Sequence, residues 1–370
     1  MPAGTIRAFH LIHDLGPGGA EHVLVDLASV ASEAGIDLTV VSMLPTGGLR
    51  YPMMLREAGV SVVSLDLRAW WDPRGPRRLR HLVEHDRPDV LHSHLKHADT
   101  VAGRVAGRTW IPHVSTLHVI EDQVSGLARA KRDLAARSRM RTTSATVAVS
   151  DVIRSWYLDT FPESPERVVV IRNGVPDPGE GSDRDRRAVR QELGIPDDAV
   201  VAATIAVMRP GKGHHALLEA ARRTEGVVYL VAGDGPLRSS LQDEAAGLPD
   251  GRVVFAGFRE DVDRILFAAD FVVHPSLADA LPTALIHAIA ASLPVIAFEV
   301  GGVPEIVPAG GGILVAPGDS AALAGAVATL AADPDRRVWM GKQGRERYDE
   351  EFTAIRWARR LRSLYEAITP

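Results

Sequence analysis

Short apolar runs alternate with longer amphipathic stretches along almost the whole chain. In the first half the apolar runs have the length of β-strands, at residues 6–12, 38–43, 60–65, 90–92, 113–117, 146–149 and 168–171. Between them, apolar residues recur at the spacing of a helix face, at residues 21–34, 51–58, 77–84 and 99–107. Strand and helix in strict turn indicate a parallel sheet covered on both faces by helices.

A polar stretch at residues 177–187, DPGEGSDRDRR, interrupts this alternation and predicts a linker. The pattern then resumes, with strands at 200–206, 227–232, 253–256, 271–274, 295–298 and 313–315. The helical stretches of this half are 214–222, 236–246, 262–268, 283–291, 321–331, 335–350 and 355–368. We therefore predict an α/β protein with two doubly wound, Rossmann-like domains that face a central cleft.

Composition narrows the class of protein. With 370 residues, the chain is long enough for a full core in each domain. A net charge of −5 gives no reason to expect a nucleic-acid partner, and the lack of cysteine excludes disulfides and thiolate metal sites. We find no secretory signal pattern and no apolar run of membrane-spanning length, so we expect a cytoplasmic protein.

Ligands of doubly wound sheets bind beyond the C-terminal ends of the strands. In the first half, Gly16-Pro17-Gly18-Gly19-Ala20-Glu21 leads from a strand into a helix, where glycines let backbone N–H groups approach an anion. A plain turn explains this motif equally well, because the third glycine of the dinucleotide fingerprint is missing. His94 and His118 end two further strands, where imidazoles can bind sugar hydroxyls or move protons. A histidine packed at a strand end is the commoner outcome.

In the second half, Arg209 and Lys212 lie in a glycine-containing turn before a helix. Two cations at a helix N-terminus favour binding of a phosphate group, although a solvated basic turn is an alternative. Residues 274–288, HPSLADALPTALIHA, continue the pattern. Asp279 lies in the loop, where its carboxylate can bind ligand hydroxyls, and the free N–H groups of Thr283 and Ala284 would point at an anion.

These elements, in this order, resemble the retaining glycosyltransferases of family 4, which have the GT-B fold. The resemblance covers nearly the whole chain, and these segments carry it: Gly18-Gly19-Ala20-Glu21, His92-Ser93-His94, Thr116-Leu117-His118, Asn173-Gly174-Val175, Lys212-Gly213, Gly233-Asp234-Gly235-Pro236, Gly257, Pro275-Ser276, Pro294-Val295 and Gly301-Gly302-Val303-Pro304-Glu305.

The resemblance implies that residues 1–176 bind the acceptor and residues 177–353 bind a nucleoside diphosphate sugar. It also implies that a C-terminal helix within residues 354–370 crosses back to the first domain. The implied reaction transfers a hexosyl-type sugar with retention, in cell-surface polysaccharide, glycolipid or secondary-metabolite biosynthesis. The implied enzyme needs no metal and no cofactor besides its donor substrate.

The resemblance also assigns roles to single residues. His118 would lie beside the transferred sugar, and it is a catalytic candidate together with Asp279. His94 and Glu21 would lie on the acceptor side. The remaining candidates would bind the donor: Gly19, Arg209, Lys212, Gly235, Phe258, Arg259, Leu281, Thr283, Ala284 and His287.

Three positions depart from the family pattern. The family commonly has two glutamates eight positions apart, where this chain has Asp279 and His287. The family's phosphate-binding arginine corresponds to Val207, so Arg209 would have to replace it. The departures at Asp279 and His287 motivate one alternative, a non-catalytic sugar-nucleotide-binding subunit. A second alternative is a sugar-nucleotide epimerase, another enzyme class on the same fold.

The stretch between Arg129 and Arg141 is rich in basic residues. Such a segment can attract anionic lipid headgroups, which would give a peripheral contact at the inner face of a membrane. Its apolar face is thin, and this favours a solvated charged helix over a membrane-bound one.

Overall fold

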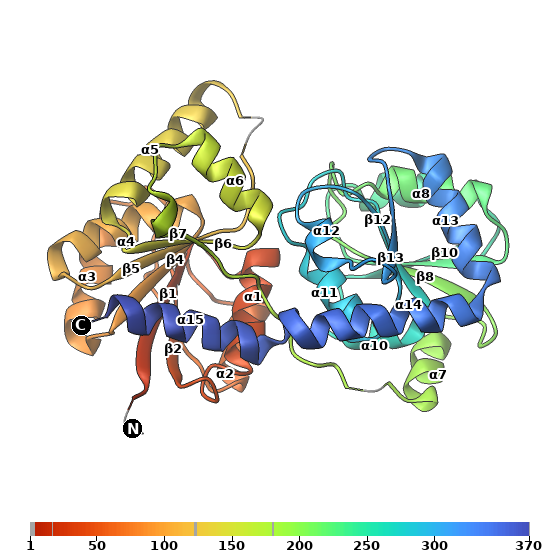
Figure 1. Cartoon of the computed structure of the whole chain (residues 1–370), viewed down its shortest axis with the longest axis horizontal. Coiled ribbons are helices and arrows are strands. Elements are labelled where there is room, and N and C mark those ends of the chain that lie inside the picture. Colours follow the sequence, from red (N-terminus) through yellow and green to blue (C-terminus); the bar gives the residue numbers. More distant parts are fainter. Residues whose placement is uncertain (1–3, 17, 122–123, 180, 370) are drawn as a thin grey trace. The chain divides into compact units, whose positions relative to one another are not determined.

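A computed structural model describes residues 4–16, 18–121, 124–179 and 181–369; Pro17 of the glycine-rich turn lies outside these ranges. The chain divides into two compact units (Figure 1). Unit 1 comprises Met1–Pro176 and Ala354–Pro370, and unit 2 comprises Asp177–Thr353. Each is described separately below.

Unit 1 contains a seven-stranded parallel sheet with the strand order β3-β2-β1-β4-β5-β6-β7. Its strands are β1 (Ile6–Ile12), β2 (Ile36–Ser42), β3 (Ser61–Ser64), β4 (Val90–His94), β5 (His113–Leu117), β6 (Ala145–Ala148) and β7 (Val168–Val170). Its helices are α1 (Gly19–Ala28), α2 (Arg50–Glu57), α3 (Gly75–Asp86), α4 (Leu95–Thr109), α5 (Gly126–Thr142), α6 (Asp151–Thr160), the 3₁₀ turn Pro165–Arg167 and α15 (Ala354–Ile368).

The two faces of this sheet have separate cores because successive side chains of a strand point to opposite sides. Ala8 and Ile12 of β1 pack with α1, α2 and α15 on one face. Phe9 and Leu11 of the same strand pack with α3 and α4 on the other face. The helix α15 (Figure 1) is strongly amphipathic. It buries Trp357, Ala358, Leu361 and Tyr365 in the first of these cores.

Unit 2 contains a six-stranded parallel sheet with the order β10-β9-β8-β11-β12-β13. Its strands are β8 (Val200–Ile205), β9 (Val227–Ala232), β10 (Val253–Gly257), β11 (Phe271–His274), β12 (Val295–Phe298) and β13 (Gly312–Val315). Its helices are α7 (Asp183–Glu192), α8 (His214–Arg223), α9 (Arg238–Ala245), α10 (Val262–Ala268), α11 (Thr283–Ala290), α12 (Val303–Ile306), α13 (Ser320–Ala332) and α14 (Pro334–Arg347), followed by the π-helical turn Tyr348–Phe352.

The predicted fold class is confirmed, since both units are parallel α/β sheets with helices between successive strands. The predicted linker at 177–187 is wrong in its second half, where α7 begins at Asp183. Ser182 caps this helix by accepting a hydrogen bond from the Asp185 N–H, and the Asp185 side chain completes a capping box. This polar segment forms a helix because its cap satisfies the free backbone groups of the first turn.

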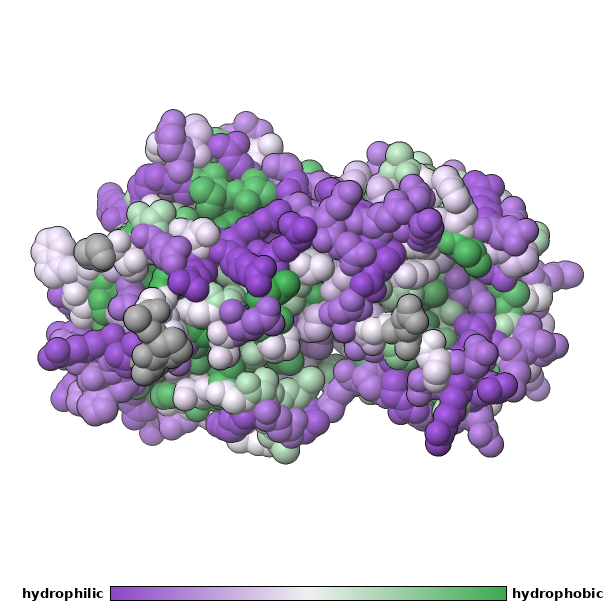
Figure 2. All heavy atoms as spheres, turned by 60° about the horizontal axis from the view of Figure 1, so that its bottom comes forward, coloured by the Kyte–Doolittle hydropathy of each residue, from purple (hydrophilic) through white to green (hydrophobic). Residues whose placement is uncertain are grey.

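None of the helices in the described parts of the chain is long and apolar enough to cross a membrane. Hydrophilic side chains cover much of the face drawn in Figure 2.

Candidate functional site

The strand order of unit 2 reverses direction between β8 and β11, which are neighbours in the sheet but 66 residues apart in the chain from Ile205 to Phe271. Loops that follow two such strands diverge to opposite sides and leave a crevice at the C-terminal edge of the sheet. The turn that carries Arg209 and Lys212 follows β8, and the loop that carries Asp279 follows β11. The predicted donor-binding residues of unit 2 therefore lie at its topological switch point.

Backbone hydrogen bonds hold these turns together. The N–H of Leu277 donates to the carbonyl oxygen of Gly211 at 2.8 Å, and the N–H of Gly302 donates to the carbonyl oxygen of Asp279 at 3.2 Å. The N–H of Met208 donates to the carbonyl oxygen of Asp234 at 2.9 Å. The turns after β8, β9, β11 and β12 thus form one connected edge.

Two glycines of this edge are required by close backbone contacts. A Cβ on Gly213 would lie 1.7 Å from the carbonyl oxygen of Pro275, and a Cβ on Gly301 would lie 1.8 Å from that of Asp279. Both glycines also have positive φ, at 73° and 48°. Any larger residue would separate the loops, so these glycines fix the positions of Lys212 and Asp279.

Lys212, Asp279 and His274 form a charged cluster at the centre of this edge. Lys212 Nζ lies 2.6 Å from Asp279 Oδ1, and His274 Nε2 lies 2.8 Å from Asp279 Oδ2. Burial alone would raise the pKa of Asp279, but the hydrogen bond with His274 and the charge of Lys212 hold it well below its usual range. The carboxylate is therefore ionised at neutral pH and keeps Lys212 in place.

The helix α11 begins beside this cluster, directly after Pro282, and no side chain caps its start. Thr283 and Ala284 are its first two residues. Their backbone N–H groups belong to the first turn, where a helix has no internal acceptors and its dipole favours negative charge. An anion beside Lys212 and this helix start would meet charge and donors together.

The structure adds His214 to this region. It is the first residue of α8, it is 2% exposed, and neither of its ring nitrogens has a hydrogen-bond partner among the described residues. Burial lowers its pKa to about 4, helped by the charges of His215 and Lys212. A buried polar ring without a partner is rare in a folded protein, so His214 becomes a further candidate for this site. Apart from its place after Gly213, no sequence pattern pointed to this residue.

The remaining predicted donor residues vary in their surroundings. Arg209 and Phe258 are exposed, and Leu281 is buried. Arg259 forms ion pairs with Glu192 and Asp261, which raise its pKa. Gly235 lies in the turn after β9, where its backbone packs closely against that of Met208. His287 of α11 is 7% exposed, with its Nδ1 3.7 Å from Asp263 Oδ1.

In unit 1, α1 begins at Gly19 with no side-chain cap, and the glycine is exposed. Glu21 is half-buried in the first turn of this helix. Burial raises the pKa of Glu21 to about 7, with a smaller contribution from the charge of Asp14. A carboxyl group that titrates near neutral pH can hold or release a proton at working pH.

The switch point of unit 1 lies between β1 and β4. His94 ends β4 and is 2% exposed, with both ring nitrogens bonded to other histidines. His118 follows β5 and bonds through Nε2 to His94 Nδ1 at 2.9 Å. The structure thus brings the two predicted histidines together, with His118 nearer the surface and His94 behind it.

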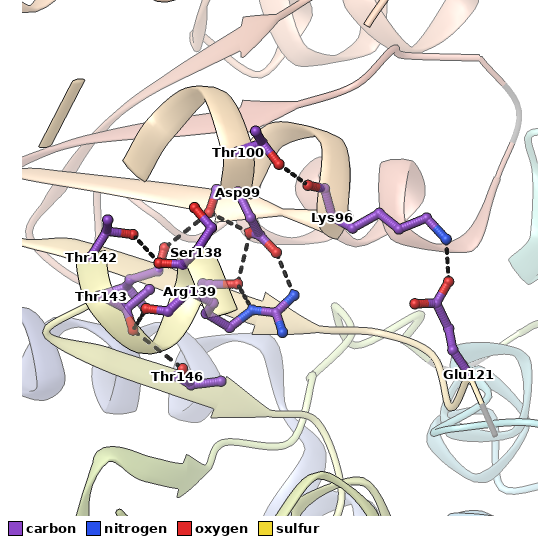
Figure 3. Close-up of polar contacts among 12 residues, drawn as sticks. Lys96, Asp99, Thr100, Glu121, Ser138, Arg139, Thr142, Thr143 and Thr146 are labelled. Atoms are coloured by element: carbon purple, nitrogen blue, oxygen red, sulfur yellow. Dashed lines mark hydrogen bonds and ion pairs between the residues drawn. The ribbon is translucent and has the colours of Figure 1, made fainter. Parts of the chain in front are cut away.

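His118 borders a cavity of about 240 Å³, which Lys96, Glu121, Arg132, Trp156 and Phe161 also line. Lys96 forms an ion pair with Glu121, and Arg139 of α5 forms a buried ion pair with Asp99 of α4 (Figure 3). A second cavity of about 200 Å³ shares Lys96 with the first. Its wall includes Trp70, whose ring stacks on His97 at 4.3 Å and lies beneath Lys131.

The basic stretch noted in the sequence forms most of α5. Two of its arginines, Arg132 and Arg139, are buried in unit 1, where Arg132 donates to the carbonyl oxygen of Glu121. The other basic side chains are exposed, and so are Leu127 and Leu134.

Comparison with known proteins agrees with this arrangement. A model for glycosyl transferases group 1 matches residues 185–347, and one for Glycosyltransferase Family 4 matches residues 17–177. The alpha-maltose-1-phosphate synthase of Mycolicibacterium smegmatis is 32% identical over 311 residues, which cover 76% of this chain and 79% of that protein. The lipopolysaccharide core biosynthesis glycosyltransferase LpsE of Rhizobium meliloti is 26% identical over 94% of this chain and 95% of its own length.

Solved structures show the same fold. HepE of Anabaena, in complex with UDP-glucose, superposes with a TM-score of 0.87 at 22% identity, covering 98% of this chain and 100% of that one. WaaG, a glycosyltransferase involved in lipopolysaccharide biosynthesis, gives a TM-score of 0.75 at 18% identity, over 97% and 99%. The class of protein is therefore a glycosyltransferase with the GT-B fold. Within that class, the chain belongs to the family 4 type.

Proposed function

We propose that this enzyme transfers a hexosyl-type sugar from a nucleoside diphosphate sugar to an acceptor hydroxyl, with retention of anomeric configuration. The observation that carries the proposal is the switch-point edge of unit 2. There, Lys212 lies in a turn locked to the Asp279 loop, beside the uncapped start of α11. Fixed positive charge and free N–H groups suit the diphosphate of such a donor.

The donor would occupy unit 2. Lys212 and the N–H groups of Thr283 and Ala284 would bind the diphosphate, and Arg209 would add a second cation. Asp279 would hold Lys212 and accept a hydrogen bond from the sugar. Phe258 and Arg259 would border the base. UDP-glucose is the first donor to test, because HepE was solved with it.

The acceptor would bind to unit 1, beside His118. The cavity there combines charged and aromatic side chains, among them Lys96, Glu121 and Trp156, a mixture suited to a glycan or a sugar phosphate. The names of the relatives, a maltose-1-phosphate synthase and a lipopolysaccharide core glycosyltransferase, support a saccharide or lipid-linked saccharide as the acceptor.

In the proposed reaction, the acceptor oxygen attacks the anomeric carbon on the face from which the diphosphate departs. The bond from that carbon to the phosphate oxygen breaks, and the acceptor proton goes to the leaving diphosphate. Lys212 and the α11 start would stabilise the growing negative charge without a metal ion, because preorganised donors act strongly in a site that excludes water.

The test has two stages. A thermal-shift screen of nucleoside diphosphate sugars identifies the donor, because a bound ligand raises the apparent unfolding temperature. Reaction with that donor and candidate saccharide acceptors, in EDTA, is then followed by NMR. We expect a product with the donor's anomeric configuration.

Four results would contradict the proposal in different ways. An inverted product would exclude retention, and activity lost in EDTA and restored by a divalent cation would exclude metal independence. Isomerisation of the donor without an acceptor would indicate the epimerase alternative. Tight donor binding with no transfer to any acceptor would indicate a non-catalytic subunit. The glycosyltransferase family membership favours neither of these alternatives.

Peripheral membrane contact through α5 is a separate proposal. Its exposed basic side chains, Arg129, Lys131, Arg137 and Arg141, and its exposed Leu127 and Leu134 would face anionic lipid. Co-sedimentation with vesicles that contain phosphatidylglycerol, compared with vesicles of phosphatidylcholine alone, tests it. Equal recovery with both vesicles would exclude it.

A further inference from the structure

A continuous chain of hydrogen bonds runs through the core of unit 1 to His118. It begins at Thr116, whose Oγ1 lies 2.6 Å from His92 Nε2. His92 Nδ1 lies 2.6 Å from the hydroxyl of Tyr365, which lies 2.9 Å from His10 Nε2. His10 is the fourth group of the chain.

Two further bonds complete the path. His10 Nδ1 lies 2.9 Å from His94 Nε2, and His94 Nδ1 lies 2.9 Å from His118 Nε2. His118 Nδ1 is the free end: it has no partner among the described residues, and the ring lines the cavity of about 240 Å³. We call the six groups the relay.

The sheet of unit 1 brings these residues together. His92 and His94 are two positions apart on β4, so their side chains share one face, and their rings stack at 4.6 Å with an interplanar angle of 16°. His10 is paired with His92 in the register between β1 and β4. Tyr365 reaches the same face from α15. All four side chains are buried.

The bonding pattern fixes where the hydrogen atoms must be. Burial lowers the pKa of His10 to about 3 and that of His118 to about 4, and it lowers those of His92 and His94 well below their usual value. The imidazoles are therefore neutral at pH 7, and each carries one N–H and one bare nitrogen. Burial also raises the pKa of Tyr365, which keeps its hydroxyl hydrogen. Every bond then needs one hydrogen, so all hydrogens point along the chain in the same direction.

The Thr116 end selects the direction. If His92 donated to Thr116, the hydroxyl hydrogen of Thr116 would need another acceptor, and within the described residues its Oγ1 bonds to His92 alone. Thr116 therefore donates to His92, His92 Nδ1–H donates to Tyr365, and Tyr365 donates to His10. The same direction, continued, places a hydrogen on His94 Nδ1 and leaves His118 Nε2 as an acceptor. His118 consequently carries its own hydrogen on Nδ1.

We propose that His10, His92, His94 and Tyr365 are positioning residues that fix the tautomer of His118, so that His118 presents an Nδ1–H donor to the substrate. The significance for catalysis rests on the proposed function, in which His118 lies beside the transferred sugar. A fixed donor binds a sugar oxygen without first reorganising, which favours the transition state. Tyr365 joins the two halves of the relay, so its hydroxyl is the most informative atom to remove.

A metal site is the competing explanation of the three buried histidines. Potential ligand atoms of His10, His92 and His94 all lie within 4.8 Å of one another. Yet each ring nitrogen of these residues already has a hydrogen-bond partner in the relay. The parallel stacking of His92 and His94 also does not direct their lone pairs at a common point. The geometry favours the relay.

The test reads the tautomer directly. The full chain is labelled with ¹⁵N-histidine, and two-bond ¹H–¹⁵N correlation spectra assign the protonated nitrogen of each ring; His118→Gln identifies the His118 signals. We expect Nδ1–H at His118 in the wild-type protein. In Tyr365→Phe, His10 Nε2 loses its donor, so the His118 signals should shift toward the Nε2–H form. The kcat should fall about 5-fold with little change in donor KM, since one neutral hydrogen bond is lost.

Two further variants keep the test interpretable. Thr116→Val removes the donor that starts the relay and preserves the shape of the side chain, so it should shift the His118 signals in the same sense. Tyr229→Phe removes another buried hydroxyl, one that bonds to Thr224 at 2.6 Å in unit 2, and should leave them unchanged. If the substitutions acted only through general folding defects, the His118 signals would shift in all three variants.

An Nε2–H signal at His118 in the wild-type protein would overturn the proposal. So would unchanged His118 signals in both Tyr365→Phe and Thr116→Val. Stoichiometric Zn²⁺ binding that His10→Gln abolishes would replace the relay with a metal site. The spectra need no sugar transfer, so failure of the proposed function would leave this readout intact.

Discussion

The two units have the same architecture but very different chemistry at their switch points. In unit 2 the edge contains ionised side chains, with Lys212 paired to Asp279, and glycines that let the turns approach closely. In unit 1 the corresponding strands carry histidines that burial keeps neutral, among them His94 and His118. A charged edge suits a diphosphate. A neutral edge suits hydroxyl groups, which form hydrogen bonds and carry no net charge.

Charge is present in unit 1 as well, in the Lys96–Glu121 pair that lines the cavity and in a buried ion pair between α4 and α5. Asp99 accepts hydrogen bonds from Ser93 at 2.6 Å and from Ser115 at 2.7 Å, and it is paired with Arg139. Here the ion pair holds α4 against α5, whereas the Lys212–Asp279 pair lies in the turns that would meet a ligand. An ion pair thus serves packing in unit 1, whereas in unit 2 we expect one to serve binding, and the following predictions test this difference.

The largest expected effect is on the stability of unit 1. Asp99→Ala leaves Arg139 as an uncompensated buried charge and should lower the free energy of unfolding by about 3–5 kcal/mol. Urea unfolding followed by tryptophan fluorescence measures it, because five of the six tryptophans lie in unit 1. Glu84→Ala is the control: it breaks an exposed pair with Arg80 and should change stability by less than about 0.5 kcal/mol. Equal losses in both variants would contradict the structural role of Asp99.

Lys212→Ala should act on binding instead. We expect donor affinity to fall about 100-fold, as for the loss of a hydrogen bond to a charged group. Calorimetric titration with the donor identified by the thermal screen measures this change. Lys342→Ala removes an exposed lysine of α14 and should bind the donor normally. Unchanged affinity in Lys212→Ala would remove the charged edge of unit 2 from the donor site.

His118→Ala should affect turnover more than binding. We expect kcat to fall about 30-fold with donor affinity nearly unchanged, because the lost interaction is made mainly in the transition state. Steady-state kinetics and calorimetry separate the two quantities. A variant that loses donor affinity but keeps kcat would place His118 in ground-state binding.

The smallest effect concerns Glu21 and pH. Its pKa is raised to about 7 in the folded chain and is near 4.5 when unfolded, so the folded form holds the proton more tightly between these values. The stability of the wild-type protein should therefore fall as pH rises from about 4.5 to 7 through this group. Glu21→Gln, which cannot ionise, should become more stable relative to wild type over the same interval, as measured by urea unfolding at several pH values. A constant difference across the interval would exclude the raised pKa.

Local patterns in the sequence were sufficient to predict the strands, because a buried parallel strand is a short apolar run and each one here is bounded by a turn. They failed where polar residues form a helix through its cap, as in α7, and they did not predict α6. The basic stretch of α5 was expected to form a charged helix, and it does. Motifs after strands pointed to Lys212 and Asp279, because their strands end at one edge of the unit 2 sheet, and to His118, which follows a strand of unit 1. Their functional roles stay predictions.

The relay could not be predicted in the same way. Nothing local distinguishes His10 from a histidine that only packs in the core. Its pairing with His92 depends on β1 and β4 being neighbours, 82 residues apart in the chain, and its bond to Tyr365 spans 355 residues. The available signal was weak: two histidines at alternate positions of one strand, His92 and His94, facing the same side as a histidine on the first strand.

The packing of α15 has a consequence for the order of synthesis. Trp357, Leu361 and Tyr365 complete the core of unit 1, yet the ribosome makes them after all of unit 2. Unit 1 therefore cannot complete its core until a segment encoded some 180 residues after Pro176, from Ala354 onward, has been made. Throughout the synthesis of unit 2, the sheet of unit 1 lacks the apolar side chains that α15 supplies.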